Sequence, residues 1–111
     1  MTDASRSPSA REVVNAIDDV LEKEKAEAWV GDAILALAAR EWILRKKGTT
    51  DGAMQARLTS NQFLAAIGNP TGVEAKIGRI YWEQGLDAAV DYVETELVPL
   101  FLKQERNRDR R

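Results

Sequence analysis

One segment of the chain, from Ala28 to Ala39, is almost entirely apolar and holds a single charged residue, Asp32. Its alanines and leucines favour a helix, and no segment of the chain shows the apolar–polar alternation of a half-buried strand. The segment is also too short and too rich in alanine to span a bilayer. We therefore expect an apolar helix within an all-α fold, with no membrane partner.

Capping residues, glycines and one proline divide the chain into a compact bundle of about five helices. Ser9 and Glu12 form a capping box ahead of the first helix, and Gly48 and Gly85 are stop signals. Pro99 is expected to bend the last helix. The predicted helices cover residues 10 to about 25, 26–47, 52–58 with a short continuation over 61–67, about 71–84, and 86 to beyond 101.

The length and composition suit one domain. A chain of 111 residues can form one hydrophobic core but not two, and 44% hydrophobic with 31% charged residues is an ordinary globular balance. We expect a disordered leader over residues 1–8, a helical domain over 9–105 and a basic tail over 106–111. The first ten residues form no apolar signal segment, so we expect a cytoplasmic location.

The absence of cysteine and histidine restricts the chemistry. Disulfides, thiolate or imidazole metal sites and Ser-His-Asp triads are excluded, so catalysis would depend on carboxylates, hydroxyls, Lys, Arg or an oxygen-ligated metal. The net charge of −2 argues against a protein that coats nucleic acid along its whole surface. Basic residues nevertheless cluster in the tail and at Arg45, Lys46 and Lys47.

Asp32 and Glu74 are candidate metal ligands because each lies beside small residues on a predicted helix. Gly31 precedes Asp32, and Gly78 follows Glu74 by one turn. Two such helices could cross closely, and their carboxylates would then converge on one Mg²⁺ ion. Two alternatives stay open from the pattern: Asp32 as a lone acid on an exposed edge, and Glu74 as the partner of Thr71 in a capping box.

Two segments resemble the signatures of the ribonuclease III family. Residues 28–35 (AWVGDAIL) are similar to its acid-x-x-Gly-Asp-Ala-Val-Leu motif, and residues 74–81 (EAKIGRIY) to its Glu-Ala-x-Ile-Gly-x-x-Tyr motif. Residues 57–65 (RLTSNQFLA) resemble the segment between them, and the likeness runs from about Ala26 to Lys103. The resemblance implies a ribonuclease III-like endonuclease domain in which Asp32 and Glu74 bind Mg²⁺ or Mn²⁺.

The chain also departs from the family pattern. Ala28 and Thr71 occupy positions where standard members carry two further acids, and the stretch between Phe63 and Glu74 is short. The compact Mini-ribonuclease III type, which has no double-stranded-RNA-binding domain, is similar in having non-acidic residues at these two positions. By the same resemblance Trp29 matches an aromatic residue at a dimer interface, although packing in the core is an equal alternative.

The resemblance implies a metal-dependent endoribonuclease that cleaves double-stranded or structured RNA as a homodimer. Phosphate contacts would come from Arg45, Lys46, Lys47, Lys76 and Arg79, although the last two also suit a solvated helix face. One alternative is an inactive member of the same fold that binds RNA or ribosomes. Another is a small helical dimerisation module without an RNA partner, in which Asp32 is a polar interface residue.

Overall fold

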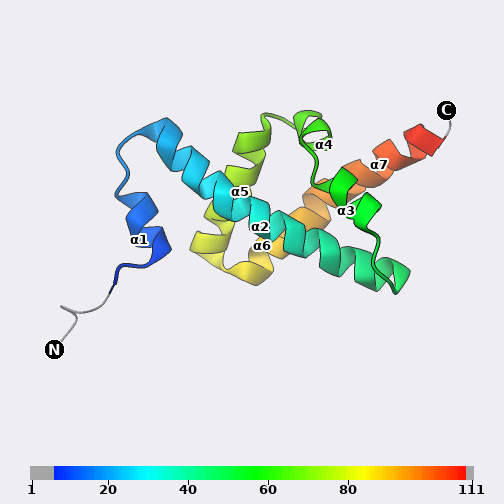
Figure 1. Ribbon diagram of the computed structural model, residues 1–111, viewed down its shortest axis with the longest axis horizontal. Helices are drawn as coiled ribbons and strands as arrows, with labels where there is room; N and C mark the ends of the chain where they lie inside the picture. Colours follow the sequence, from blue (N-terminus) through cyan, green and yellow to red (C-terminus); the bar gives the residue numbers. More distant parts are fainter. Residues whose placement is uncertain (1–6, 110–111) are drawn as a thin grey trace.

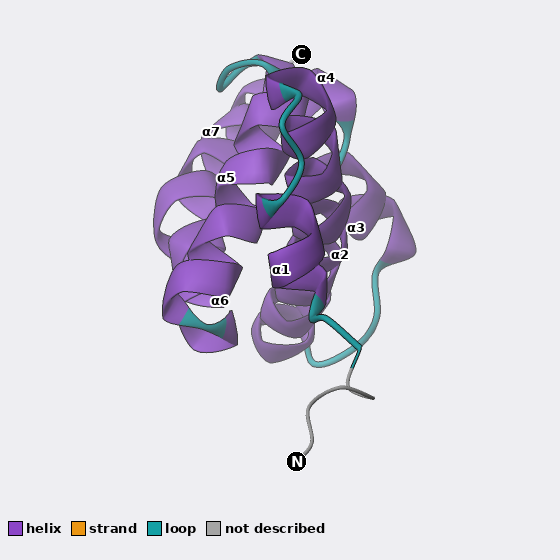
Figure 2. Cartoon of the chain, turned by 90° about the vertical axis from the view of Figure 1, so that its left-hand side faces the viewer, coloured by secondary structure: helices purple, strands orange, loops and turns teal. Residues whose placement is uncertain are grey.

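The computed structural model describes residues 7–109, and within this range the chain forms helices and no strand (Figures 1 and 2). The all-α prediction is confirmed. The helices, in chain order, are α1 (Ala10–Asn15), α2 (Val20–Lys47), α3 (Gly52–Leu58), α4 (Asn61–Ala65), α5 (Pro70–Gln84), α6 (Leu86–Tyr92), the π-helical segment η2 (Val93–Leu97) and α7 (Val98–Asp109). Most of the predicted leader, and the end of the predicted tail, lie outside the described residues.

The predicted boundary between the first two helices is wrong. The capping box of Ser9 and Glu12 is present, but α1 ends at Asn15. The carboxylate of Asp19 accepts a hydrogen bond from the Glu22 N–H, so Asp19 is the N-cap of a second helix that begins at Val20. The acid-rich stretch after Asp19 therefore forms the first turns of α2 and not the end of α1.

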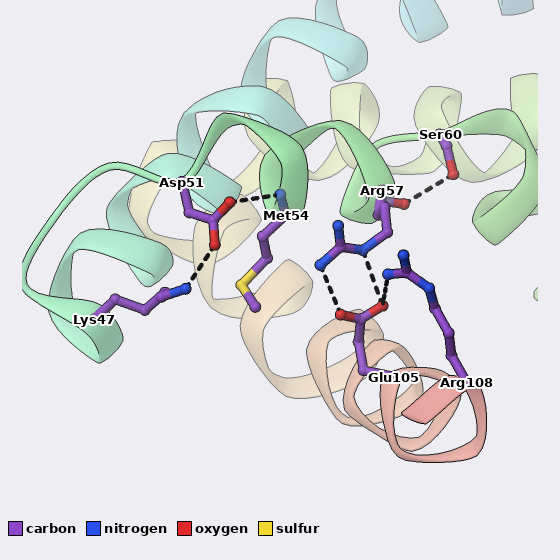
Figure 3. Close-up of polar contacts among 7 residues, drawn as sticks. All are labelled: Lys47, Asp51, Met54, Arg57, Ser60, Glu105 and Arg108. Carbon is purple, nitrogen blue, oxygen red and sulfur yellow. Dashed lines mark hydrogen bonds and ion pairs between the residues drawn. The ribbon is translucent and has the colours of Figure 1, made fainter. Parts of the chain in front are cut away.

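The predicted C-terminus of α2 and the predicted N-termini of α3 and α4 are confirmed, and each of these helix ends has a cap. Gly48 ends α2 in the left-handed region at φ 74°. Asp51 caps α3 through the Met54 N–H, and Ser60 caps α4 through the Phe63 N–H. Ion pairs then hold α3 in place (Figure 3): Asp51 pairs with Lys47 of α2, and Arg57 makes two hydrogen bonds to Glu105 of α7 at 3.1 and 2.8 Å.

The N-terminus of α5 decides between the two interpretations of Glu74. Asn69 is the N-cap, since its side chain accepts a hydrogen bond from the Gly72 N–H, and Pro70 occupies the first turn. Thr71 is therefore already inside the helix, and the predicted capping box of Thr71 and Glu74 is wrong. The Glu74 carboxylate is free to lie elsewhere.

Pro99 changes the last helix locally. Proline has no N–H to donate to the carbonyl four residues earlier, and its ring would clash with that carbonyl. The preceding turn widens into the π-helical segment η2, in which the Val98 N–H bonds to the Val93 carbonyl. The chain then continues as α7, which extends to the end of the molecule opposite α1 (Figure 1).

The core forms around α2, which packs along α5 and also contacts α3, α6 and η2. Phe63 and Phe101 meet edge to face with ring centroids 5.6 Å apart, and Trp42 packs against Phe101. Leu35, Leu58, Leu64 and Ile77 are fully buried beside them. Among the described helices none is long and apolar enough to cross a membrane.

Candidate functional site

The two predicted signature segments meet where α2 crosses α5. A Cβ atom on Gly31 would lie 1.7 Å from the Glu74 carbonyl oxygen, and a Cβ on Gly78 would lie 2.2 Å from the Glu27 carbonyl oxygen. Both distances are far below van der Waals contact, so only glycine allows the two backbones to approach this closely. The predicted close crossing is present.

The crossing brings the side chains of Asp32 and Glu74 together. Asp32 lies at the solvent-exposed edge of α2, and Glu74 is half-buried on α5. Burial raises the pKa of the Glu74 carboxyl, and a hydrogen bond with Asp32 and the charge of Asp32 raise that pKa further, to about 7. Asp32 is therefore not a lone acid on a helix edge.

Neither of these carboxylates has a lysine or arginine partner among residues 7–109. Ala28, one turn before Asp32, is buried, and Thr71, one turn before Glu74, is half-buried, so neither of these positions adds a carboxylate. In the described part of the chain no three acidic side chains gather around one point. The arrangement is thus a pair of adjacent carboxylates with one face open to solvent, which suits one divalent cation that keeps part of its water shell.

The basic cluster at the end of α2 lies roughly 20 Å along the helix from Asp32, since each residue adds about 1.5 Å. Arg45 is paired with Glu94 of η2, and Lys47 with Asp51 at 2.6 Å. The Lys46 Nζ atom lies over the Trp42 ring, 5.9 Å from the ring centroid. All three are exposed at one end of the helix, away from the carboxylate pair.

The two basic residues that flank Glu74 point to different neighbours. The Lys76 Nζ atom lies 5.1 Å from the centroid of the Tyr92 ring, against α6. Arg79 donates a hydrogen bond to the Glu27 carboxylate of α2 at 3.0 Å. Both side chains thus contact neighbouring helices, and they do not simply form a solvated face.

Trp29 does not pack in the core. It is 82% exposed, so the alternative of core packing is wrong. Leu37 and Leu44 follow on the same side of α2 and are 37% and 48% exposed. Trp29 precedes Asp32 by three residues, so these two side chains are neighbours on α2. Exposed apolar side chains that gather in one patch mark contact surfaces in folded proteins.

Sequence reasoning missed Glu27, which is 6% exposed and lies at the same crossing as the carboxylate pair. It belongs to an acid-rich stretch, and its residue type does not distinguish it from the other acids there. The available signal was spacing, because Glu27 lies one turn before Gly31 and its ion-pair partner Arg79 directly follows Gly78.

Compared with known proteins, the sequence matches no family profile, and neither a curated protein nor a solved structure is similar to the chain.

Proposed function

We propose that the protein is a divalent-metal-dependent endoribonuclease of the ribonuclease III type, acting in the cytoplasm on double-stranded or structured RNA. The observation that carries the proposal is the meeting of Asp32 and Glu74 at the glycine crossing of α2 and α5. Burial, a hydrogen bond with Asp32 and the charge of Asp32 together raise the pKa of Glu74, and neither carboxylate has a basic partner among the described residues. A divalent cation would balance their negative charge.

In this proposal Asp32 and Glu74 hold one Mg²⁺ or Mn²⁺ ion. When bound, such an ion activates water and neutralises charge on the scissile phosphate. The chain's own contribution is to hold the two carboxylates at a fixed separation on two rigid helices, with one side open to a polyanionic substrate. Because the half-exposed Glu74 is partly protonated near pH 7 without metal, ion binding displaces a proton from it.

RNA contact would extend from the carboxylate pair along α2 to its basic end. Lys46 and Lys76 are the best placed of the proposed phosphate contacts, because both are exposed and neither has a carboxylate partner among the described residues. Arg45 and Lys47 each share their charge with an acid, and Arg79 is engaged with Glu27. Contacts of this type recognise the shape of an A-form duplex rather than its sequence.

A homodimer is part of the proposal. Trp29 is three residues from Asp32 on α2, so a second copy seated on Trp29 would lie close to the carboxylate pair. A large, rigid aromatic side chain that is 82% exposed on a helix is well suited to fill a pocket of a partner.

The second candidate function is binding without cleavage, by the same fold and surface. The specific observation in its favour is that Ala28 and Thr71 stand at the two positions where the ribonuclease III family, which the chain resembles, carries further acids. A site with two carboxylates binds a cation more weakly than a site with four. RNA would then bind with steep salt dependence and remain intact.

The experiment is a cleavage assay on long double-stranded RNA with Mg²⁺ or Mn²⁺, comparing the wild type with Asp32→Asn and Glu74→Gln. Cleavage by the wild type alone would support the endonuclease. Glu83→Gln is a matched control, since Glu83 is an exposed acid on the same helix as Glu74. If the wild type leaves the RNA intact with both ions but binds it, the binding function replaces the enzymatic one. If it neither cleaves nor binds RNA at low salt, the chain is a helical dimerisation module.

A further inference from the structure

The crossing of α2 and α5 also holds an ion pair that neither the family signatures nor the proposed chemistry requires. Glu27 is the one charged residue that is buried within residues 7–109. Its carboxylate accepts a hydrogen bond from Arg79 Nη1 at 3.0 Å, and the Arg79 side chain remains 43% exposed. A buried acid with a single partner is costly to desolvate, and an apolar pair of similar volume often stabilises a fold equally well. Stability alone is therefore a weak reason for this pair.

The ion pair of Glu27 and Arg79 lies on one flank of the glycine contact, and the carboxylates of Asp32 and Glu74 lie on the other. Glu27 and Asp32 are five residues apart on α2, which separates them by roughly 140° around the helix axis. Glu74 and Arg79 have the same spacing on α5. The two helices thus touch at Gly31 and Gly78, with Asp32 and Glu74 meeting on one side and Glu27 and Arg79 on the other.

The glycine contact sets how closely the helices approach but presents no side chain that could fix their register. A buried ion pair can fix that register, because any slip or rotation that separates Glu27 from Arg79 leaves a charge unpaired in the interior.

We propose that Glu27 and Arg79 are positioning residues, which hold α5 in the register where Glu74 faces Asp32. The pair acts as an attractive contact on the flank of the crossing opposite Asp32 and Glu74. Its consequence for metal binding rests on the proposed function, whereas its effect on helix register does not.

The test replaces the ion pair by the apolar pair Glu27→Leu with Arg79→Leu. We expect this double variant to remain folded, with a thermal midpoint in the absence of metal no lower than that of the wild type. We expect the Mn²⁺ concentration at the midpoint of thermal stabilisation to rise at least tenfold. Arg79→Lys, which keeps the cation, should stay within threefold of the wild type. The matched control is Arg57→Leu with Glu105→Leu, which removes the ion pair between α3 and α7 and should leave the Mn²⁺ midpoint unchanged.

A second readout needs no metal. The wild type should show a nuclear Overhauser contact between an α-proton of Gly31 and the amide proton of Gly78, because the Gly78 nitrogen lies 3.0 Å from the position of a Gly31 Cβ. The double leucine variant should weaken this contact. If that variant does not fold, Glu27→Gln with Arg79→Gln takes its place.

An unchanged Overhauser contact together with an unchanged Mn²⁺ midpoint in the folded double variant overturns the proposal. A wild type that shows no stabilisation by Mn²⁺ removes the proposed metal function instead. In that case the Overhauser contact alone decides whether the ion pair sets the register.

Discussion

The α-carbon of Gly31 packs directly on the carbonyl oxygen of Glu74, so closely that a methyl group at Gly31 would lie 1.7 Å from that oxygen. This contact is between backbones on both sides, and neither helix can yield by changing a rotamer. It sets the separation at which the side chains of Asp32 and Glu74 meet. The site therefore depends on Gly31 and on its counterpart Gly78, which have no side chain.

We expect Gly31→Ala and Gly78→Ala each to lower the free energy of unfolding by about 3 kcal/mol or more, because the new methyl groups would overlap backbone atoms. Gly52→Ala is the matched control. No atom lies within 4 Å of its Cβ position, so alanine at this helical site should be neutral or stabilising by up to about 1 kcal/mol. Urea denaturation followed by circular dichroism measures all three. Equal stability of Gly31→Ala and Gly52→Ala would contradict the close crossing.

We expect the metal-free protein to lose stability as the pH rises from about 4.5 to about 7. The folded-state pKa of Glu74 is raised above its ordinary value, so the folded protein holds a proton that the unfolded chain has released in this range. The contribution of Glu74 is therefore complete below pH 4.5 and lost above pH 7. Its size should be on the order of 1 kcal/mol, because solvent screens the half-exposed pair.

Asp32→Asn should make this pH dependence shallower and should stabilise the metal-free protein at pH 8, since it removes the charge facing Glu74. The dependence should not vanish, because burial of Glu74 remains. Urea titrations at pH 5, 6, 7 and 8 for both proteins give the comparison. Identical slopes in wild type and Asp32→Asn would show that the two carboxylates do not interact.

We expect Trp29→Ala to weaken self-association at least about 30-fold, the effect of losing a central aromatic anchor. The stability of the monomer should change by less than about 0.5 kcal/mol, because the side chain is 82% exposed. Sedimentation equilibrium measures the association. Leu86→Ala is the control, an exposed apolar residue on α6. A wild type that sediments as a monomer at high concentration would rule out the proposed homodimer.

We expect Lys46→Gln to reduce the slope of log affinity for double-stranded RNA against log salt concentration by about 0.9, the value for one lost phosphate contact. Lys25→Gln should leave the slope unchanged, since Lys25 lies in the acid-rich start of α2 beside Glu22. Fluorescence anisotropy over a range of salt concentrations gives both slopes. The same slope for Lys46→Gln and the wild type would remove this residue from the RNA surface.

Local capping chemistry explains which helix boundaries were predictable. Gly48, Asp51 and Ser60 lie in short polar segments between two apolar runs, and the helix ends predicted there agree with the structure. The predictions at two other helix starts are wrong. Asp19 begins a new helix inside an apparently continuous one, and Asn69 takes the capping role expected of Thr71. Propensity and spacing do not rank two neighbouring caps, because the choice depends on where the rest of the helix packs.

The sequence by itself determined that the fold is helical, that catalysis cannot use histidine or cysteine, and that Asp32 and Glu74 each lie beside small residues. These properties follow from residue type and local spacing. Only the tertiary structure decided that the two acids meet, that Trp29 faces solvent, and that Glu27 is buried against Arg79. Such contacts join residues far apart in the chain, and they depend on which face of α2 packs on α5. The crossing of two backbones at Gly31 and Gly78 sets that choice.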